Sequence, residues 1–277
     1  MDDGTLLQEL DERGVLTVTL NRPAAKNAFT TVMQRRMIQT FYDASRDPAV
    51  RVLVLRGAAD AFCTGGDVRT LGAPDPEDPV AQRWASEPVW GAHEARVERL
   101  RKNIEASLLL YRMGKPTIAM VRGPAAGAGM SLALACDFRV VSDTAFFVTS
   151  FAKLGMSGDF GGTYFLTKLV GPSKAKELYM FSERVTAAHA LELGIVNRMV
   201  ADAQLESETA SFAERLSQGA PLALRYIKEN VHAAVDGPLE RAFDTETTNM
   251  IRTRLTEDAK EAMQAFTEKR DATFRGL

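Results

Sequence analysis

The sequence has little cysteine, little histidine and no large excess of charge. Only Cys63 and Cys136 occur in 277 residues, without metal-type spacing, so we expect a reducing compartment and no metal site. The formal net charge of −2 disfavours a dedicated nucleic-acid binder, which normally carries a basic face. No apolar run reaches membrane-spanning length, and residues 1–4 lack the basic and apolar regions of a signal peptide. These absences predict a cytoplasmic protein with neither a membrane nor a nucleic-acid partner.

The chain is long and apolar enough for a sizeable core, since 45% of its residues are hydrophobic. Residues 5–10 and 15–20 alternate in polarity around a short turn and predict a hairpin, while 51–57 predicts a strand covered on both faces. Strands separated by helices predict an α/β fold of ββα units with right-handed crossovers. We expect two parts, a core over 1–200 and a helical region over 201–277.

The stretch 115–137 is the most informative segment. Its apolar run 117–121 predicts a buried strand, and Gly123 and Pro124 then break that strand. A buried helix is expected from Gly127, because small apolar residues and good helix formers follow. The first turn of such a helix leaves backbone N–H groups unpaired, which suits an anion or a developing oxyanion. A tight packing corner is the alternative.

Other segments carry more general expectations. A helix capped by Thr30 or Thr31 should run to about residue 45, and 72–79 should be exposed irregular chain. Residues 81–101 have no clean period, whereas a following helix should turn Ile104, Leu108 and Tyr111 inward. The histidines His189 and His232 are expected at the surface. Further helices are expected over 162–170, 173–181, 187–193, 206–217, 221–234, 239–251 and 257–267.

Four segments together resemble the crotonase superfamily, also called the enoyl-CoA hydratase/isomerase family. They read LNRPAAKNA at 20–28, AFCTGGD at 61–67, the stretch 115–137, and EAMQAFTEKR at 261–270. The resemblance spans nearly the whole chain, and the four motifs occur in the family's order and spacing. It implies a crotonase-like spiral of ββα units whose helical C-terminal region forms a homotrimer or a dimer of trimers.

The resemblance also implies the chemistry of the glycine-rich segments. The family's substrates are acyl-CoA thioesters, whose carbonyl becomes an enolate or similar oxyanion held by two backbone N–H groups. Those donors here would be the N–H groups of Gly66 and Ala128, with Thr64, Gly65 and Gly129 beside them. Gly65 and Gly66 taken alone could be an ordinary turn.

The resemblance places coenzyme A binding in two segments far apart in the chain. Lys26 and Ala28 lie where the family's coenzyme A loop binds the nucleotide, and lysine supplies a point charge for phosphate. Phe266 and Lys269 match residues that often reach the coenzyme A of a neighbouring subunit, although helix packing and a solvated face are alternatives. Asp67 matches the aspartate after the oxyanion glycine and is expected to be structural or pocket-lining.

The carboxylates depart from the hydratase pattern. The family's hydratases activate water with two glutamates, and the matching positions here are Ser131 and Phe151, so paired acid–base catalysis lacks its groups. Asp159 instead matches the acidic residue that isomerases of the family use for proton transfer. If Phe151, Phe160 and Phe165 line its pocket, desolvation would raise its pKa toward that of a useful base. Alternatively, Asp159 could cap the helix that begins near residue 161.

Three functions remain open from the sequence. The leading hypothesis is an acyl-CoA isomerase that shifts a double bond from the β,γ to the α,β position, with Asp159 as its catalytic residue. The second is an enoyl-CoA hydratase or lyase acting on an unusual bulky acyl-CoA. The third is a non-catalytic protein of the same fold that binds acyl-CoA or RNA. No cofactor is expected, because coenzyme A is part of the substrate, and the acyl group is left open because 71–101, including His93, has no readable pattern.

Overall fold

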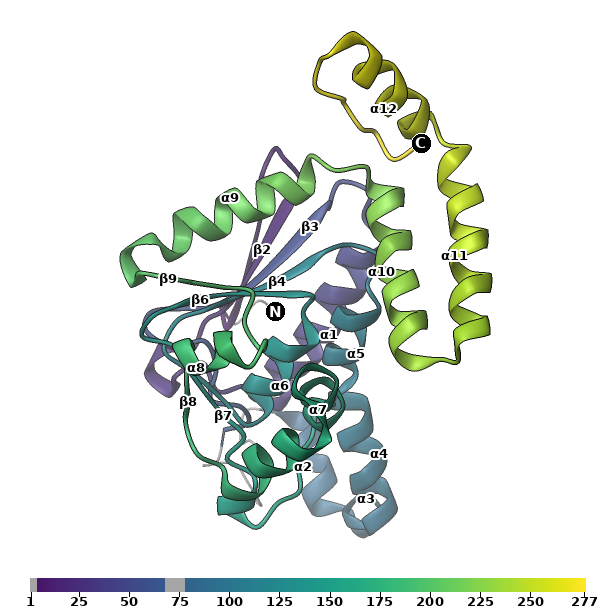
Figure 1. The fold of residues 1–277 in the computed structure, drawn as a ribbon. Helices are drawn as coiled ribbons and strands as arrows, with labels where there is room; N and C mark the ends of the chain where they lie inside the picture. Colours follow the sequence, from purple (N-terminus) through teal and green to yellow (C-terminus); the bar gives the residue numbers. More distant parts are fainter. Residues whose placement is uncertain (1–3, 68–77) are drawn as a thin grey trace.

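A six-stranded sheet forms the centre of the computed structural model, which describes residues 4–67 and 78–277 (Figure 1). The strand order is β1-β2-β3-β4-β6-β9, antiparallel between β1 and β2 and parallel elsewhere. The strands are β1 (Leu6–Leu10), β2 (Val15–Leu20), β3 (Val52–Gly57), β4 (Thr117–Val121), β6 (Phe138–Ser142) and β9 (Arg198–Val200). The expected hairpin and the doubly covered third strand are confirmed.

A second, three-stranded sheet lies beyond the carboxyl ends of the central strands. It contains β5 (Pro124–Ala126), β7 (Phe146–Val148) and β8 (Val185–Thr186), in the order β5-β7-β8. Each of β4 and β6 continues after a short turn into a strand of this smaller sheet. Turn residues such as Gly123 make these bends possible: its φ is +57°, and a Cβ there would lie 2.0 Å from the carbonyl oxygen of Asp60.

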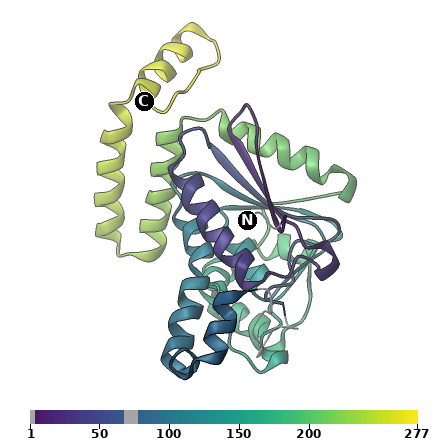
Figure 2. The same ribbon diagram turned by 180° about the vertical axis from the view of Figure 1, so that it is seen from behind.

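Helices cover both faces of the central sheet. Alternate residues of β3 point to opposite sides, so Val52 and Val54 pack toward α9 (Leu205–Ser217) while Leu53 and Leu55 join the larger core. Figure 2 shows α1 (Thr31–Arg46) on the face opposite α9. The other helices on that larger core are α5 (Glu105–Arg112), α6 (Ala128–Ala135), α7 (Gly162–Phe181) and α8 (Ala187–Glu192).

The last three helices form an arm, of which the first lies beside the core and the other two extend beyond it (Figure 1). They are α10 (Pro221–Asp236), α11 (Leu239–Arg254) and α12 (Glu257–Glu268), and α10 and α11 pack against each other. Large apolar side chains on the arm are exposed in the single chain, including Leu239, Phe243, Met250, Leu255 and Phe266. The expected α/β core with a helical C-terminal region is confirmed, whereas a domain boundary at residue 200 stays a prediction.

Sequence expectations were weakest between residues 68 and 112. Residues 72–77 lie outside the described residues, and Asp78, expected in exposed chain, is buried and caps α2 (Pro79–Ser86). The segment without a clean period forms α2, α3 (Pro88–Gly91) and α4 (His93–Asn103). The inward placement of Leu108 is wrong: its side chain is 41% exposed, and Ala106 and Leu110 are the residues of α5 that enter the core.

The two helices expected over 162–181 are joined as α7, with a break in helical geometry at Gly171. Thr30 caps α1 through a hydrogen bond from the N–H of Met33, as the sequence indicated. Within residues 4–67 and 78–277, no helix has both the length and the apolar character needed to cross a bilayer.

Candidate active site

Two free backbone donors occur where the loop 63–67 meets the start of α6. Gly65 has φ +89°, and a Cβ there would lie 3.1 Å from the amide nitrogen of Ala128, so the two segments are in close contact. The N–H of Gly65 donates to the Sγ of Cys63. In the part of the chain that the structure describes, the N–H groups of Gly66 and Ala128 have no hydrogen-bond acceptor. Both are therefore free to bind an external oxygen.

The close packing of α6 explains why its first residues are small. All eight of its residues are buried, and a Cβ on Gly129 would lie 2.3 Å from the carbonyl oxygen of Cys63. Gly129 thus serves the approach of helix and loop. Gly127 precedes the helix at φ +52° and offers no side-chain cap, which leaves the first-turn N–H groups uncovered. The helix dipole adds a partial positive charge at the same end.

Polar side chains hold the loop 63–67 and the residues just before it in place. Fully buried Asn27 donates its amide to the carbonyl oxygens of Ala58 and Ala61, a role that the sequence reading missed. Asp67 is buried in an ion pair with Arg22 at 3.2 Å, which agrees with the structural role considered for it.

Burial raises the pKa of the Cys63 thiol to about 12, so this cysteine is a structural residue. Its Sγ links two segments of the site, because it accepts from the N–H of Gly65 and donates to the carbonyl oxygen of Asn27. Thr64 completes this connection, since its N–H donates to the carbonyl oxygen of Lys26 at 3.2 Å. The loop that carries Gly66 is therefore fixed before any substrate binds.

The residues predicted to bind coenzyme A lie in two separate places. Lys26 is exposed and forms an ion pair with Asp60 at 2.6 Å. Ala28 is buried, with its N–H bonded to the carbonyl oxygen of Ala25. Phe266 and Lys269 lie at the end of the arm, far from the core of their own chain, and the Phe266 side chain is 87% exposed (Figure 1). The two groups therefore lie in different parts of the single chain.

Asp159 lies in a tight turn directly before α7. The N-cap of α7 is Gly161 and receives no side-chain hydrogen bond, so the alternative of Asp159 as the helix cap is wrong. Its Oδ1 atom is sealed from solvent and has no hydrogen-bond partner among the described residues. Burial raises the pKa of this carboxyl to about 6. It is the kind of carboxyl that can accept and return a proton near neutral pH.

Aromatic contacts connect the Asp159 turn to the segments that carry the two free donors. The Phe160 ring lies 5.2 Å from that of Phe29, whose backbone pairs with Gly66. A Cβ on Gly127 would lie 3.8 Å from Cζ of Phe151. Phe160 and Phe151 are both buried, as is Phe165, which packs against Tyr111 and Tyr164. Buried aromatic rings therefore pack between the Asp159 turn and the segments that carry the two donors.

Ser131 is one turn beyond Ala128 on α6, and its surroundings include a residue that the sequence reading missed. A Cβ on Gly162 would lie 2.2 Å from Oγ of Ser131 and 2.5 Å from the hydroxyl oxygen of Tyr179. The Tyr179 ring also stacks on Phe151, with centroids 6.2 Å apart and planes 7° from parallel. Periodicity on α7 could have placed Tyr179 inward, but no local motif marks it as part of this site.

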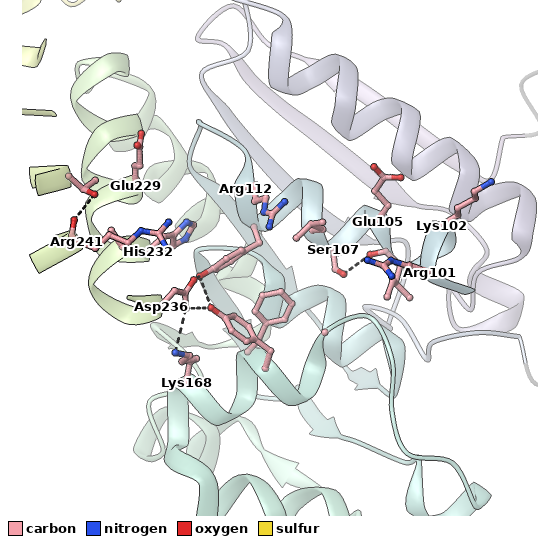
Figure 3. Close-up of a pocket in the computed structure, with 18 of the residues that line it drawn as sticks. Arg101, Lys102, Glu105, Ser107, Arg112, Lys168, Glu229, His232, Asp236 and Arg241 are labelled. Atoms are coloured by element: carbon pink, nitrogen blue, oxygen red, sulfur yellow. Dashed lines mark hydrogen bonds and ion pairs between the residues drawn. The ribbon is translucent and has the colours of Figure 1, made fainter. Parts of the chain in front are cut away.

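A cavity of about 940 Å³ lies between the core and the arm, with Gly161 of the Asp159 turn in its wall (Figure 3). Its wall includes Asp236, which accepts hydrogen bonds from the hydroxyls of Tyr111 and Tyr164 and forms an ion pair with Lys168. The surface position expected for His232 is wrong, because its ring is half-buried and stacks on Tyr111. His189 is exposed as expected, and His93 is exposed at the start of α4.

The structure is an α/β fold in which two free backbone donors and the Asp159 turn are linked through aromatic side chains. A family model described as enoyl-CoA hydratase/isomerase matches residues 11–276. The chain therefore belongs to the enoyl-CoA hydratase/isomerase family, which confirms the expected superfamily.

Solved structures of similar proteins cover nearly the whole chain. An enoyl-CoA hydratase from Polaromonas sp. JS666 is 30% identical over 97% of this chain and 99% of its own, with a TM-score of 0.86. An enoyl-CoA hydratase subunit I from Geobacillus kaustophilus HTA426 is 35% identical over 99% and 98%, with a TM-score of 0.84. A protein from Thermobifida fusca YX, provisionally named an enoyl-CoA hydratase and solved with CoA, is 31% identical over 92% and 95%, with a TM-score of 0.80.

Proposed function

We propose that this protein is an acyl-CoA isomerase that moves a double bond from the β,γ to the α,β position. The observation that carries the proposal is the Asp159 carboxyl, whose Oδ1 is buried without a hydrogen-bond partner among the described residues, with a serine and a phenylalanine at the two positions where the family's hydratases carry glutamates. Hydration needs one group to activate water and another to supply a proton. A 1,3-proton shift needs only one group that takes a proton and returns it.

The proposed reaction uses the free donors and the carboxylate in turn. The N–H groups of Gly66 and Ala128 hold the thioester oxygen as negative charge develops on it. The Asp159 carboxylate removes a proton from C2, and the electron pair moves into the C1–C2 bond as the oxygen becomes an enolate. The double bond then forms between C2 and C3 while C4 takes the proton back from Asp159. Atoms and charge balance without a cofactor.

Hydration is the second candidate, and the names of the similar structures favour it, since they are called enoyl-CoA hydratases. The two reactions can be separated with paired substrates in water enriched in oxygen-18. We expect a 3-enoyl-CoA to be converted to the 2-enoyl-CoA without label. If a 2-enoyl-CoA instead gains labelled oxygen at a rate comparable to isomerisation, the isomerase proposal is wrong.

The raised pKa of Asp159 gives a specific pH dependence. The carboxylate form is the active base, so kcat/KM should be constant above pH 7 and fall tenfold per pH unit well below about 6. An ordinary aspartate would keep its activity to a much lower pH. Initial rates between pH 4.5 and 8 would test this, with circular dichroism at each pH to exclude unfolding. A fall in kcat/KM centred near the ordinary pKa of an aspartate would show that the Asp159 carboxyl with its raised pKa is not the base.

We also propose acyl-CoA as the substrate and a homotrimer, or a dimer of trimers, as the active assembly. The family supports the first proposal, and the CoA complex of the Thermobifida protein is consistent with it. The apolar side chains exposed on α11 and α12 support the second, because a soluble monomer rarely exposes a patch of that kind. A neighbouring arm would bring Phe266 and Lys269 to the Lys26 loop.

Replacing Leu255 with glutamate should dissociate the assembly. This side chain is 74% exposed on the arm, and a charge there could not be buried against a neighbour without a partner. Light scattering during size-exclusion chromatography should give three or six chain masses for the unmodified protein and one for the variant. Leu191→Glu, on α8 of the core, is a control for adding charge to the surface. A monomeric unmodified protein would contradict the proposal.

A further inference from the structure

The two positions that carry glutamates in the family's hydratases are filled here by parts of one side-chain cluster. Phe151 occupies one position, and Tyr179 stacks on its ring. Ser131 occupies the other position. Its hydroxyl oxygen and that of Tyr179 both lie close to where a Cβ on Gly162 would be. We expect a longer side chain at residue 131 to displace Tyr179, because the Ser131 hydroxyl already lies against Gly162 and Tyr179. Tyr179 therefore links both altered positions.

Tyr179 also contacts both ends of the turn that carries Asp159. A Cβ on Gly158, at φ +122°, would lie 3.2 Å from Cε1 of the Tyr179 ring and 3.8 Å from Cδ2 of Phe151. At the other end, the hydroxyl approaches Gly162. Both glycines are thus required for close approach of this ring. The Tyr179 side chain therefore lies against the residues on either side of Asp159 in the chain, and Oδ1 of Asp159 is sealed from solvent.

The chemistry of the cluster suits exclusion of water. Burial is the main cause that raises the pKa of Tyr179 to about 12, with Asp159 contributing in the same direction and Ser131 opposing it. The hydroxyl is therefore neutral at physiological pH and cannot activate water as a base. Asp159 has its own raised pKa from burial, with no charged side chain of the described residues contributing. Desolvation of the Asp159 carboxyl is therefore the cause of its raised pKa.

We propose that Tyr179, stacked on Phe151, is a specificity-determining residue that seals the α6 side of the Asp159 pocket against water. The seal confines the enolate to proton return from Asp159 and keeps water from adding at C3 of the 2-enoyl product. This inference rests on the proposed isomerase function. It assigns to Tyr179 a positioning role, since the ring acts through Asp159 and not on the substrate.

The fate of the transferred proton tests the seal. A 3-enoyl-CoA carrying deuterium at C2 would be converted in ordinary water, and the deuterium at C4 of the product measured by NMR. The unmodified protein should return most of the removed deuterium to C4, because in this proposal the Tyr179 ring keeps water from the buried Oδ1 of Asp159. Tyr179→Ala should lose most of that label to water and move the acid limb of kcat/KM below pH 6, toward the ordinary carboxyl value.

Tyr179→Phe is the matched control, because it keeps the ring and removes only the hydroxyl. It should retain the label and the pH limb of the unmodified protein. If Tyr179→Ala does not fold by circular dichroism, Tyr179→Leu shortens the side chain without adding polarity and should show the same loss. Complete loss of label by the unmodified protein, or full retention by a folded alanine or leucine variant, would overturn the seal.

A readout without turnover separates this inference from the proposed function. The Asp159 carboxyl can be titrated by infrared difference spectroscopy, with Asp159→Asn as the subtraction. Its pKa should be near 6 in the unmodified protein and lower in Tyr179→Ala. If the unmodified protein does not isomerise a 3-enoyl-CoA, the proposed function is wrong. If the pKa of the Asp159 carboxyl is unchanged in Tyr179→Ala, the proposed seal is wrong.

Discussion

Replacing Asp159 with asparagine should reduce isomerisation of a 3-enoyl-CoA by about 100- to 10,000-fold, the range usual for loss of a general base. The amide has nearly the same shape but cannot accept the C2 proton. Because the loss concerns proton transfer, kcat should fall while KM changes little. Steady-state rates of the purified variant, with binding measured separately by calorimetry, would show this division.

Two comparisons make the Asp159 result specific. Asp43→Asn removes an exposed carboxylate on α1 and should leave the rate unchanged, which controls for the loss of one charge. Asp159→Glu keeps a carboxylate but displaces it, and should recover part of the activity. Turnover of Asp159→Asn within threefold of the unmodified protein would show that another group performs the proton transfer.

Gly65→Ala should lower kcat by about 100- to 1,000-fold, as expected for loss of one oxyanion donor. The backbone at this residue is at φ +89°, which an L side chain rarely adopts, and the new methyl group would lie 3.1 Å from the amide nitrogen of Ala128 and from the carbonyl oxygen of Ala126. The loop must then move, and Gly66 moves with it. Both the chemical step and binding of an enolate analogue should weaken.

Gly194→Ala separates the site effect from backbone strain. Gly194 also has a positive φ, +74°, but it lies at the surface with open space around its Cα. Its alanine variant should lose some thermal stability and no activity. If Gly65→Ala and Gly194→Ala have similar kinetics, the contact between the loop 63–67 and α6 has no part in the reaction.

Local patterns were enough to predict most elements of the fold. The expected strand 117–121 and the helices from 187 to 267 agree with the structure within about three residues, because turn residues, caps and apolar periodicity act over short distances. The prediction that Leu108 points inward is wrong because α5 borders a cavity, and an apolar residue on that side of the helix remains exposed. Periodicity gives the direction of a helix face but not what covers it.

The site was predictable only in part, because its members meet through tertiary contacts. Gly66 and Ala128 were proposed from motifs, and the structure brings their loop and helix together. Tyr179 is far in sequence from Phe151 and Ser131, so no spacing rule connects the three. The case against hydration rests on Ser131 and Phe151, which the sequence shows, whereas their contact with Tyr179 is visible only in the structure.

The sealed oxygen of Asp159 has a consequence for folding. Its pKa is about 6 in the folded chain against an ordinary value of 3.8, so the folded state binds more protons than the unfolded state between these two pH values. The free energy of unfolding therefore decreases as the pH rises through this window, and the loss persists at neutral pH. The same group that would carry out proton transfer keeps the native state below its greatest thermodynamic stability.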